Sequence, residues 1–399
     1  MIQFETTEKE KTPRAEILTR HTKKVLKGNS AAAVAAKLSR VSLVTAYPIT
    51  PQTSIIEEIT SMIIRKEFDA VSVNMDSEHS VFAALIGASL VGERVFTATS
   101  GQGLLYAHEV LHAIAHMRLP IVACNVGRPS FPWNIWADQT DSISQRDTGW
   151  VQYYCESSQE ILDTIIQSYK LAEQLKLPVM VVLDAFYMSH TSENVYIPDQ
   201  QLVDTFCPPR KKEDDQIELD QPKAFGGLVA PNMYDKYNKL YWESINRVEE
   251  ETIKTGRDFD NTFGRKYAAV EAVNIHPGTK IILVTMASIT TTARQVVAEH
   301  PEVGLLKIRL FKPFPKKSVL DVLEKASNDS IIINIDRNFL GDHEGALMQE
   351  MKRALYNYPK KIFGVYAGLG GRDVSADTIK KIIDIDYKSP STDEVLWIK

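Results

Sequence analysis

Hydrophobic and polar positions along the chain alternate between two periods. Short apolar runs rich in β-branched residues and bounded by turn residues predict buried strands at 42–47, 70–75, 94–100, 119–126 and 177–186. Between them, apolar positions recur with the 3.6-residue period of a helix, at 54–66, 80–92, 103–117 and 158–176. Strands that alternate with helices at this spacing predict parallel βαβ units and a doubly wound sheet.

A polar segment interrupts this pattern from about Ser189 to Pro277. It contains a run of charged residues, a glycine pair and prolines that include Pro208, Pro209 and Pro222, followed by a charged helical period near 234–256. Further strand-like runs follow at 280–288, 303–311, 330–336 and 361–368. We therefore expect an N-terminal arm, an α/β domain, a connector with a charged helix, and a second, smaller α/β domain, over 1–27, 28–189, 190–277 and 278–399.

Composition narrows the class of protein. A chain of 399 residues that is 44% hydrophobic and 24% charged is typical of a soluble globular protein with two or three domains. The net charge of -5 gives no basic field for nucleic acid. Because no stretch approaches about 20 apolar residues and the N-terminus lacks a signal peptide, we expect a cytoplasmic protein that does not enter membranes.

The cysteines exclude one kind of site. Only Cys124, Cys155 and Cys207 occur, far apart and in no CxxC spacing, so this chain cannot supply a four-cysteine iron–sulfur or zinc site. Any redox metal is expected on another chain.

Candidate chemistry lies in loops that follow the predicted strands, because ligands bind outside the carboxyl ends of parallel strands. Thr50 stands between two prolines that stiffen its turn; the alternative is a rigid connector that caps the next helix. Glu78 opens an apolar helix, which predicts a partly buried carboxylate; the alternative is a solvated glutamate favoured by the helix dipole. The loop at 99–103, with Ser100 and Gln102, offers backbone N–H groups to an anion but lacks the lysine of a P-loop.

One motif points to a different chemistry. His108, His112 and the intervening Glu109 match HExxH, and His116 continues the same helix face. A zinc protease needs a suitable third ligand, and no glycine follows at the position this class requires. We therefore favour ordinary helix histidines at the surface of an element or subunit.

Seven stretches together resemble the alpha subunit of the 2-oxoacid:ferredoxin oxidoreductases, of the pyruvate synthase type. The resemblance covers about residues 28–375, and it rests on the order and spacing of YPITPQT, SEHSVFAALIGASLVGERVFTATSGQGL, NIWADQTDSISQRDTGWVQ, FGRKYAAVE, RLFKPFP, INIDRN and AGLGGRDVS. It implies that thiamine diphosphate binds between a pyrimidine-binding domain at 28–189 and a beta subunit that holds the diphosphate and Mg. The second half is then a transketolase C-terminal-like domain.

The resemblance also implies partners and roles. Iron–sulfur clusters lie on gamma and ferredoxin-like subunits, coenzyme A is a co-substrate, and ferredoxin or another acceptor takes the electrons. Glu78 matches the carboxylate that hydrogen-bonds the aminopyrimidine ring, and Thr50 and Arg128 match the groups that hold the substrate carboxylate. A decarboxylase or transferase without redox chemistry, and a structural subunit with a vestigial site, remain the alternatives.

The loop around Arg128 departs from the family pattern. It is one residue shorter and enriched in Phe131, Trp133 and Trp136. These aromatics predict either a pocket for a larger side chain, such as the phenyl group of phenylglyoxylate, or packing against a partner subunit. The substrate therefore stays open between pyruvate and an aryl 2-oxoacid.

Overall fold

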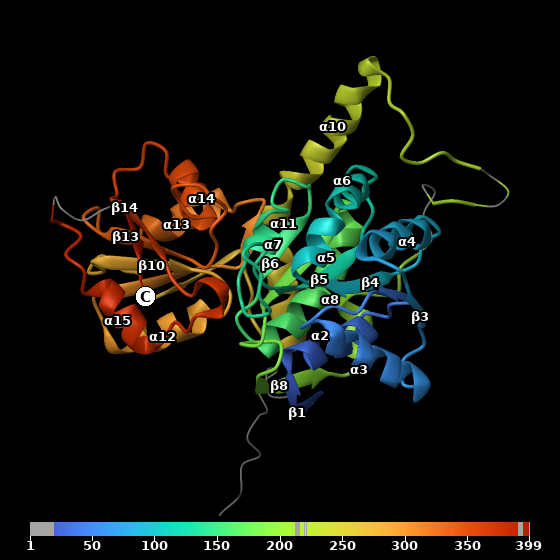
Figure 1. The fold of residues 1–399 in the computed structure, drawn as a ribbon, viewed down its shortest axis with the longest axis horizontal. Coiled ribbons are helices and arrows are strands. Elements are labelled where there is room, and N and C mark those ends of the chain that lie inside the picture. Colours follow the sequence, from blue (N-terminus) through green and yellow to red (C-terminus); the bar gives the residue numbers. More distant parts are fainter. Residues whose placement is uncertain (1–19, 212–215, 219, 221, 390–393, 399) are drawn as a thin grey trace, which may run out of the picture.

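Two α/β domains lie side by side in the computed structural model, each built around one open sheet (Figure 1). The structure describes residues 20–211, 216–218, 220, 222–389 and 394–398. A seven-stranded sheet has the order β12-β6-β7-β5-β4-β2-β3, and a six-stranded sheet has the order β15-β14-β13-β10-β11-β9. The predicted fold class, α/β with two doubly wound domains, is confirmed.

The first domain has helices on both faces of its sheet. Its parallel strands are β2 (Leu43–Ala46), β3 (Val71–Asn74), β4 (Val95–Thr99), β5 (Val122–Gly127), β6 (Val151–Tyr154) and β7 (Val179–Asp184). One face carries α2 (Gly28–Leu38), α3 (Thr53–Ile64) and α8 (Ser158–Leu175), and the other carries α4 (Glu78–Leu90), α5 (Gly101–Tyr106) and α6 (His108–His116). Successive residues of β5 show the alternation: Val122 and Cys124 join the first core and Ala123 the second.

The second domain repeats this layering on a smaller scale. Its strands are β9 (Val270–Val273), β10 (Ile281–Thr285), β11 (Val303–Ile308), β13 (Ile331–Asp336), β14 (Ile362–Tyr366) and β15 (Val395–Trp397). All pair in parallel except β9, which runs antiparallel to β11. Its helices are α12 (Ile289–Glu299), α13 (Lys316–Leu323), α14 (Ala346–Ala354) and α15 (Ala376–Ile383). Figure 1 shows α12 and α15 below the sheet and α13 and α14 above it.

The structure differs from the expected N-terminal arm. Residues 1–19 lie outside the described part of the chain, but His21–Lys27 forms β1, which pairs antiparallel with β8 (Ser192–Pro198). The sequence did not predict this strand, because lysines and a threonine stand on both of its faces and apolar and polar residues do not alternate along it.

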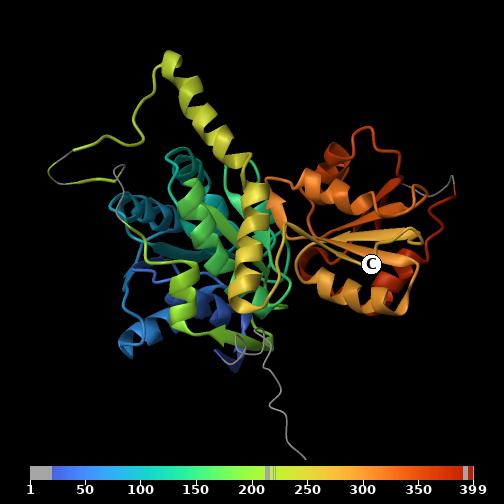
Figure 2. The ribbon, with the colours of Figure 1, turned by 180° about the vertical axis from the view of Figure 1, so that it is seen from behind.

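Much of the expected connector is also ordered against a domain. It holds β8, α9 (Gln200–Phe206), α10 (Pro231–Ile245), α11 (Val248–Phe263) and β9. Helix α11 packs on α8 and α9 and buries Phe259 and Phe263 completely. The helix near 234–256 is therefore two helices, and only α10 projects from the body of the molecule (Figures 1 and 2).

One predicted strand, 303–311, serves both sheets. Its first part is β11 of the second domain, and its last part begins β12 (Leu310–Lys312), which pairs antiparallel with β6 of the first domain. The chain thus returns to the first sheet after building part of the second.

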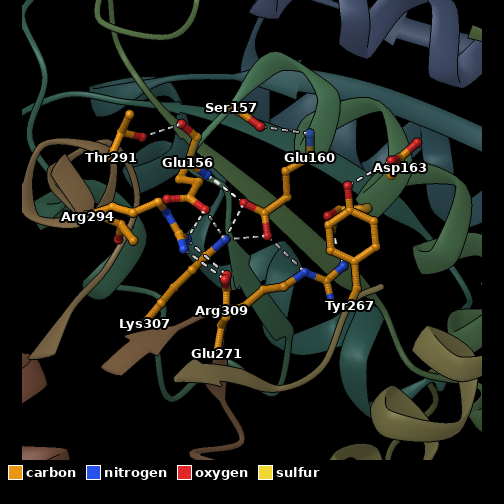
Figure 3. Close-up of polar contacts among 12 residues, drawn as sticks. Glu156, Ser157, Glu160, Asp163, Tyr267, Glu271, Thr291, Arg294, Lys307 and Arg309 are labelled. Atoms are coloured by element: carbon orange, nitrogen blue, oxygen red, sulfur yellow. Dashed lines mark hydrogen bonds and ion pairs between the residues drawn. The ribbon is translucent and has the colours of Figure 1, made fainter. Parts of the chain in front are cut away.

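A network of buried charges joins the domains beside this crossing, as Figure 3 shows. Lys307 Nζ lies 2.7 Å from Glu160 Oε2 and 3.0 Å from Glu156 Oε1, and Arg309 Nε lies 3.2 Å from Glu160 Oε1. Arg294 reaches Glu156 Oε1 at 2.6 Å. Burial raises the pKa of Glu160, but Lys307 and Arg309 outweigh burial, so the pKa lies below its usual value. The cations thus hold a buried carboxylate ionised.

Candidate active site

The loops that follow β2, β3, β4 and β5 meet at the carboxyl edge of the first sheet. They bring together Thr50, Glu78, Gln102 and Arg128, as expected from their positions after parallel strands. The structure therefore assembles four of the predicted site residues in one place.

Glu78 is the first residue of α4, and its carboxyl is held close to the next loop. Ser77 caps the helix by accepting a hydrogen bond from Ser80 N at 3.2 Å. A Cβ on Gly103 would lie 2.3 Å from Glu78 Oε1, so only glycine leaves space for this carboxyl. Burial raises the pKa of Glu78, although a backbone hydrogen bond and the charge of Arg128 act in the opposite direction. A carboxyl whose pKa is raised by burial in a cleft is a candidate for proton transfer.

Arg128 follows β5 and is buried with its guanidinium directed across the site. NH1 donates to the backbone carbonyl of Thr50, and NH2 donates to Gln102 Oε1 at 2.7 Å. Its Nε has no hydrogen-bond partner among the described residues. Burial lowers the pKa of Arg128, while Asp141 and Glu78 raise it. Nε is packed against Gly101, so a ligand would meet the charge of the guanidinium and not this donor. A buried cation held by two hydrogen bonds is suited to bind a carboxylate.

Thr50 contacts Arg128 through its main chain. Its loop is fixed by two hydrogen bonds, from Gln52 Nε2 to Tyr47 O and from Asn29 Nδ2 to Pro51 O, both 2.8 Å long. Thr50 itself is exposed, with a cis peptide bond to Pro51. The role of its hydroxyl toward substrate stays a prediction.

Ser100 and Gln102 take different parts in the site. Ser100 Oγ is buried and donates to Val126 O at 2.6 Å, which ties β4 to β5. Gln102 Nε2 donates to Ser130 O at 2.6 Å while its Oε1 accepts from Arg128. Gln102 thus orients the guanidinium, and Ser100 supports the loop.

Asp141 is a central residue that the sequence analysis missed. Its Oδ2 accepts from Gly101 N at 2.8 Å, Arg128 N at 3.1 Å and Asn125 Nδ2 at 3.1 Å. Burial raises its pKa to about 7 against the pull of these bonds. The backbone N–H of Gly101 in the 99–103 loop thus binds a carboxylate of the chain itself, where the sequence analysis considered an anionic ligand. Asp141 stands in a polar stretch at the start of α7 (Thr140–Ile143), and only the structure shows that this stretch is buried.

The three aromatic residues of the Arg128 loop are exposed. Phe131, Trp133 and Trp136 are 74%, 59% and 50% exposed, respectively. Trp136 packs on Phe186 with ring centroids 4.7 Å apart, and a Cβ on Gly371 of the second domain would lie 2.1 Å from its Cβ. Trp136 is thus held at the domain boundary, and the choice between aryl pocket and subunit contact stays a prediction for the other two.

The HExxH histidines have contacts of their own. His108 Nδ1 lies 2.6 Å from Gln145 Oε1, and the rings of His108 and His112 meet edge to face at 4.9 Å. His116 stacks on Tyr241 of α10. In the described part of the chain, no group of three or more His, Cys, Asp or Glu side chains is arranged to hold a metal ion. The described helices are also too short or too polar to cross a membrane.

Comparisons with known proteins identify the family of the chain. A family model described as pyruvate flavodoxin/ferredoxin oxidoreductase, thiamine diP-bdg, matches residues 34–256, and core domain II of pyruvate:ferredoxin oxidoreductase matches 279–379. The ketoisovalerate oxidoreductase subunit VorA of Pyrococcus horikoshii is 42% identical over 91% of this chain and 93% of its own length. The pyruvate synthase subunit PorA of Methanocaldococcus jannaschii is also 42% identical, over 94% of this chain and 97% of its own.

Two solved structures share the fold. The 2-oxoglutarate:ferredoxin oxidoreductase from Magnetococcus marinus superposes with a TM-score of 0.70 and 18% identity, covering 90% of this chain and 64% of that chain. A split-gene transketolase gives a TM-score of 0.50 at 12% identity, over 89% of this chain and 96% of that chain. The family models span most of the chain, and the relatives are of similar length and about 40% identical. The chain therefore belongs to the 2-oxoacid:ferredoxin oxidoreductase family and is a subunit of the same type as PorA and VorA.

Proposed function

We propose that this chain is the alpha subunit of an enzyme that oxidatively decarboxylates a 2-oxoacid to an acyl-CoA and CO2. The observation that carries the proposal is the placement of a buried carboxyl, Glu78, and a buried guanidinium, Arg128, at one edge of the first sheet. The first suits a cofactor ring that must exchange a proton, and the second suits a substrate that carries a carboxylate.

The residues present fit the pyrimidine half of thiamine diphosphate. Glu78 is buried and its pKa is raised. Residue 103 is a glycine, so no side chain there overlaps the carboxyl of Glu78. Thiamine diphosphate, when bound, supplies the carbon nucleophile and the electron sink for decarboxylation. Glu78 would hold the aminopyrimidine nitrogen through a hydrogen bond and move the proton on that bond.

Arg128 would bind the substrate carboxylate and orient the 2-oxoacid. Gln102 and the Thr50 carbonyl hold its guanidinium by two hydrogen bonds, so little rotamer freedom remains to be lost on binding. The Thr50 hydroxyl is the proposed second contact. This chain therefore supplies recognition and proton transfer, and the remaining chemistry needs other chains.

Those chains are the proposed beta subunit, which holds the cofactor diphosphate and Mg, and gamma and ferredoxin-like subunits with the iron–sulfur clusters. The relatives are named as subunits, which supports a multi-subunit assembly. Burial raises the pKa of all three thiols, at Cys124, Cys155 and Cys207, so none is poised as a thiolate ligand. Electrons would leave through the partners to ferredoxin or another acceptor.

The substrate side chain is proposed to be small and aliphatic, with pyruvate first. The relatives named for ketoisovalerate are 42–43% identical to this chain and those named for pyruvate are 38–42% identical. Phenylglyoxylate is the alternative, because Phe131 and Trp133 are exposed aromatics beside Arg128.

The test is an assay of the purified assembly with pyruvate, 3-methyl-2-oxobutanoate, 2-oxoglutarate and phenylglyoxylate. We expect reduction of ferredoxin or a viologen dye that requires a 2-oxoacid, coenzyme A and thiamine diphosphate. Release of CO2 without electron transfer would instead identify a non-redox decarboxylase. Absence of turnover in an assembly that binds the cofactor would indicate a vestigial site.

A further inference from the structure

A glycine-rich turn of the second domain lies directly against the loop that carries Arg128. The turn, Leu369–Gly371, follows β14 and contains Gly370 and Gly371 with φ of +61° and +83°. Residues other than glycine rarely adopt these φ values, and a Cβ on Gly371 would overlap Trp136. The glycines of the AGLGGRD stretch therefore allow a close approach between backbones.

Several hydrogen bonds cross the domain boundary at this point, including one from Tyr187 OH to Gly371 O at 3.1 Å. Asn134 Nδ2 donates to Gly370 O at 3.0 Å, and Gly370 N donates to Asp138 Oδ2 at 2.9 Å. Gln139 N donates to Arg337 O, at the end of β13, at 3.0 Å. Both polar groups of the Gly370 main chain are thus used to hold a loop more than 200 residues away in the sequence.

The contact continues from Asp138 to the two sides of Arg128. Asp138 N donates to Gly127 O at 3.3 Å, and its Oδ1 accepts from Thr140 N at 2.9 Å. Thr140 Oγ1 in turn accepts from Ser130 N at 2.9 Å. Since Gly127 precedes Arg128 and Ser130 lies two residues beyond it, the backbone of Arg128 is fixed on both sides by groups tied to Asp138.

The buried carboxylate of Asp138 would lose stabilisation if either of its two backbone hydrogen bonds were broken. It is 3% exposed, and each carboxylate oxygen accepts one backbone N–H. Burial raises its pKa, and the N–H groups of Gly370 and Thr140 lower it. Loss of the Gly370 donor would leave a buried oxygen without its partner, which is costlier than loss of an exposed bond.

We propose that the glycine turn of the second domain positions Arg128 for the substrate carboxylate, with Asp138 as the positioning residue that connects the two. The proposal rests on the proposed function of Arg128. It gives the second domain a part in substrate recognition, although none of its residues needs to touch the substrate.

The test is Asp138→Asn in the assembled enzyme. The amide keeps the shape of the side chain but replaces one of its two acceptor oxygens with an NH2 donor. Either the Gly370 N–H or the Thr140 N–H then has no acceptor, so one of the two hydrogen bonds is lost. We expect KM for the 2-oxoacid to rise about three- to tenfold, with kcat and the Kd for thiamine diphosphate close to those of the unchanged enzyme. Hydrogen exchange of the 128–139 backbone is expected to become faster.

Thr291→Val is the matched control. It removes another hydrogen bond between the domains, from Thr291 Oγ1 to Glu156 O at 3.2 Å, with almost no change in volume and away from the Arg128 loop. We expect its KM and its exchange in 128–139 to be unchanged. Equal changes in both variants would overturn the proposal, because any weakened domain contact would then suffice.

Arg128→Met separates this proposal from the proposed function. If Arg128→Met raises KM and Asp138→Asn does not, positioning by the second domain is refuted while the role of Arg128 stands. If Arg128→Met leaves KM unchanged, Arg128 does not bind the substrate, and the proposed function fails at that residue. Faster exchange together with a raised KM in Asp138→Asn alone supports the proposal.

Discussion

Replacement of Arg128 by methionine removes the charge of the proposed substrate clamp and keeps a side chain of similar length. In the structure this guanidinium is buried, has two of its nitrogens held by Thr50 O and Gln102 Oε1, and keeps Nε free of any partner among the described residues. A hydrogen bond to a charged group contributes about 1.5–3 kcal/mol. Because about 1.4 kcal/mol is a factor of ten, kcat/KM is expected to fall roughly 10- to 100-fold.

The assay is the initial rate of dye reduction by the assembled enzyme over a range of 2-oxoacid concentrations. Thr50→Ala is the comparison, since it removes a neutral hydroxyl and leaves the backbone carbonyl that holds Arg128. A neutral hydrogen bond contributes about 0.5–1.5 kcal/mol, so a loss of about two- to tenfold is expected. Binding of thiamine diphosphate should be retained in both. A value of kcat/KM within about twofold of the unchanged enzyme for Arg128→Met would refute the reasoning.

Four further predictions concern proton transfer, assembly and stability. Glu78→Gln is expected to lower turnover about 100-fold or more in the assembled enzyme, and a near-normal rate would leave Glu78 as a helix-terminal residue only. The isolated chain is expected to bind thiamine diphosphate weakly, since it supplies only the pyrimidine half of the site; tight binding by calorimetry would contradict this. Lys307→Met leaves the buried Glu160 with one cation, Arg309, and the backbone N–H of Glu156, so the free energy of unfolding in urea is expected to fall by about 3 kcal/mol. The pKa of Asp141, raised to about 7 by burial, makes the folded chain bind a proton that the unfolded chain loses near pH 4. This group therefore lowers stability as the pH rises from about 4 to about 7, and Asp141→Asn should remove that part of the pH dependence measured by urea unfolding.

The sequence predicted those elements whose side chains show one clear period. The buried strands β2, β4, β5 and β7 and the helices α3, α4 and α8 were all expected close to their observed positions. The pairing of β1 with β8 was not, because an exposed two-stranded ribbon needs little apolar alternation. The division of 303–311 between two sheets was also invisible, since a run of apolar residues does not say which sheet it joins.

The candidate site shows a similar limit. Loop positions after parallel strands pointed to Thr50, Glu78 and Gln102, the family resemblance pointed to Arg128, and the structure brings the four together. Asp141 was missed because its role depends on four hydrogen bonds from three separate segments, which no spacing along the chain encodes. Burial of a polar group is a tertiary property, so the hydrogen-bonded support of a site is harder to predict than its chemistry.

The return of the chain to its first sheet affects the synthesis of the protein. Strand β7 ends at Asp184 and β12 ends at Lys312, so 128 more residues must be made after the last parallel strand of the first sheet before the strand that completes it is finished. At about 5–20 residues per second, a ribosome needs roughly 6–26 s to cover that distance. During this interval the nascent first domain exposes the backbone edge of β6, whose residues are all buried in the finished protein. The first domain thus completes its sheet only after about a third of the second has been made, and the order of translation leaves a strand edge open until then.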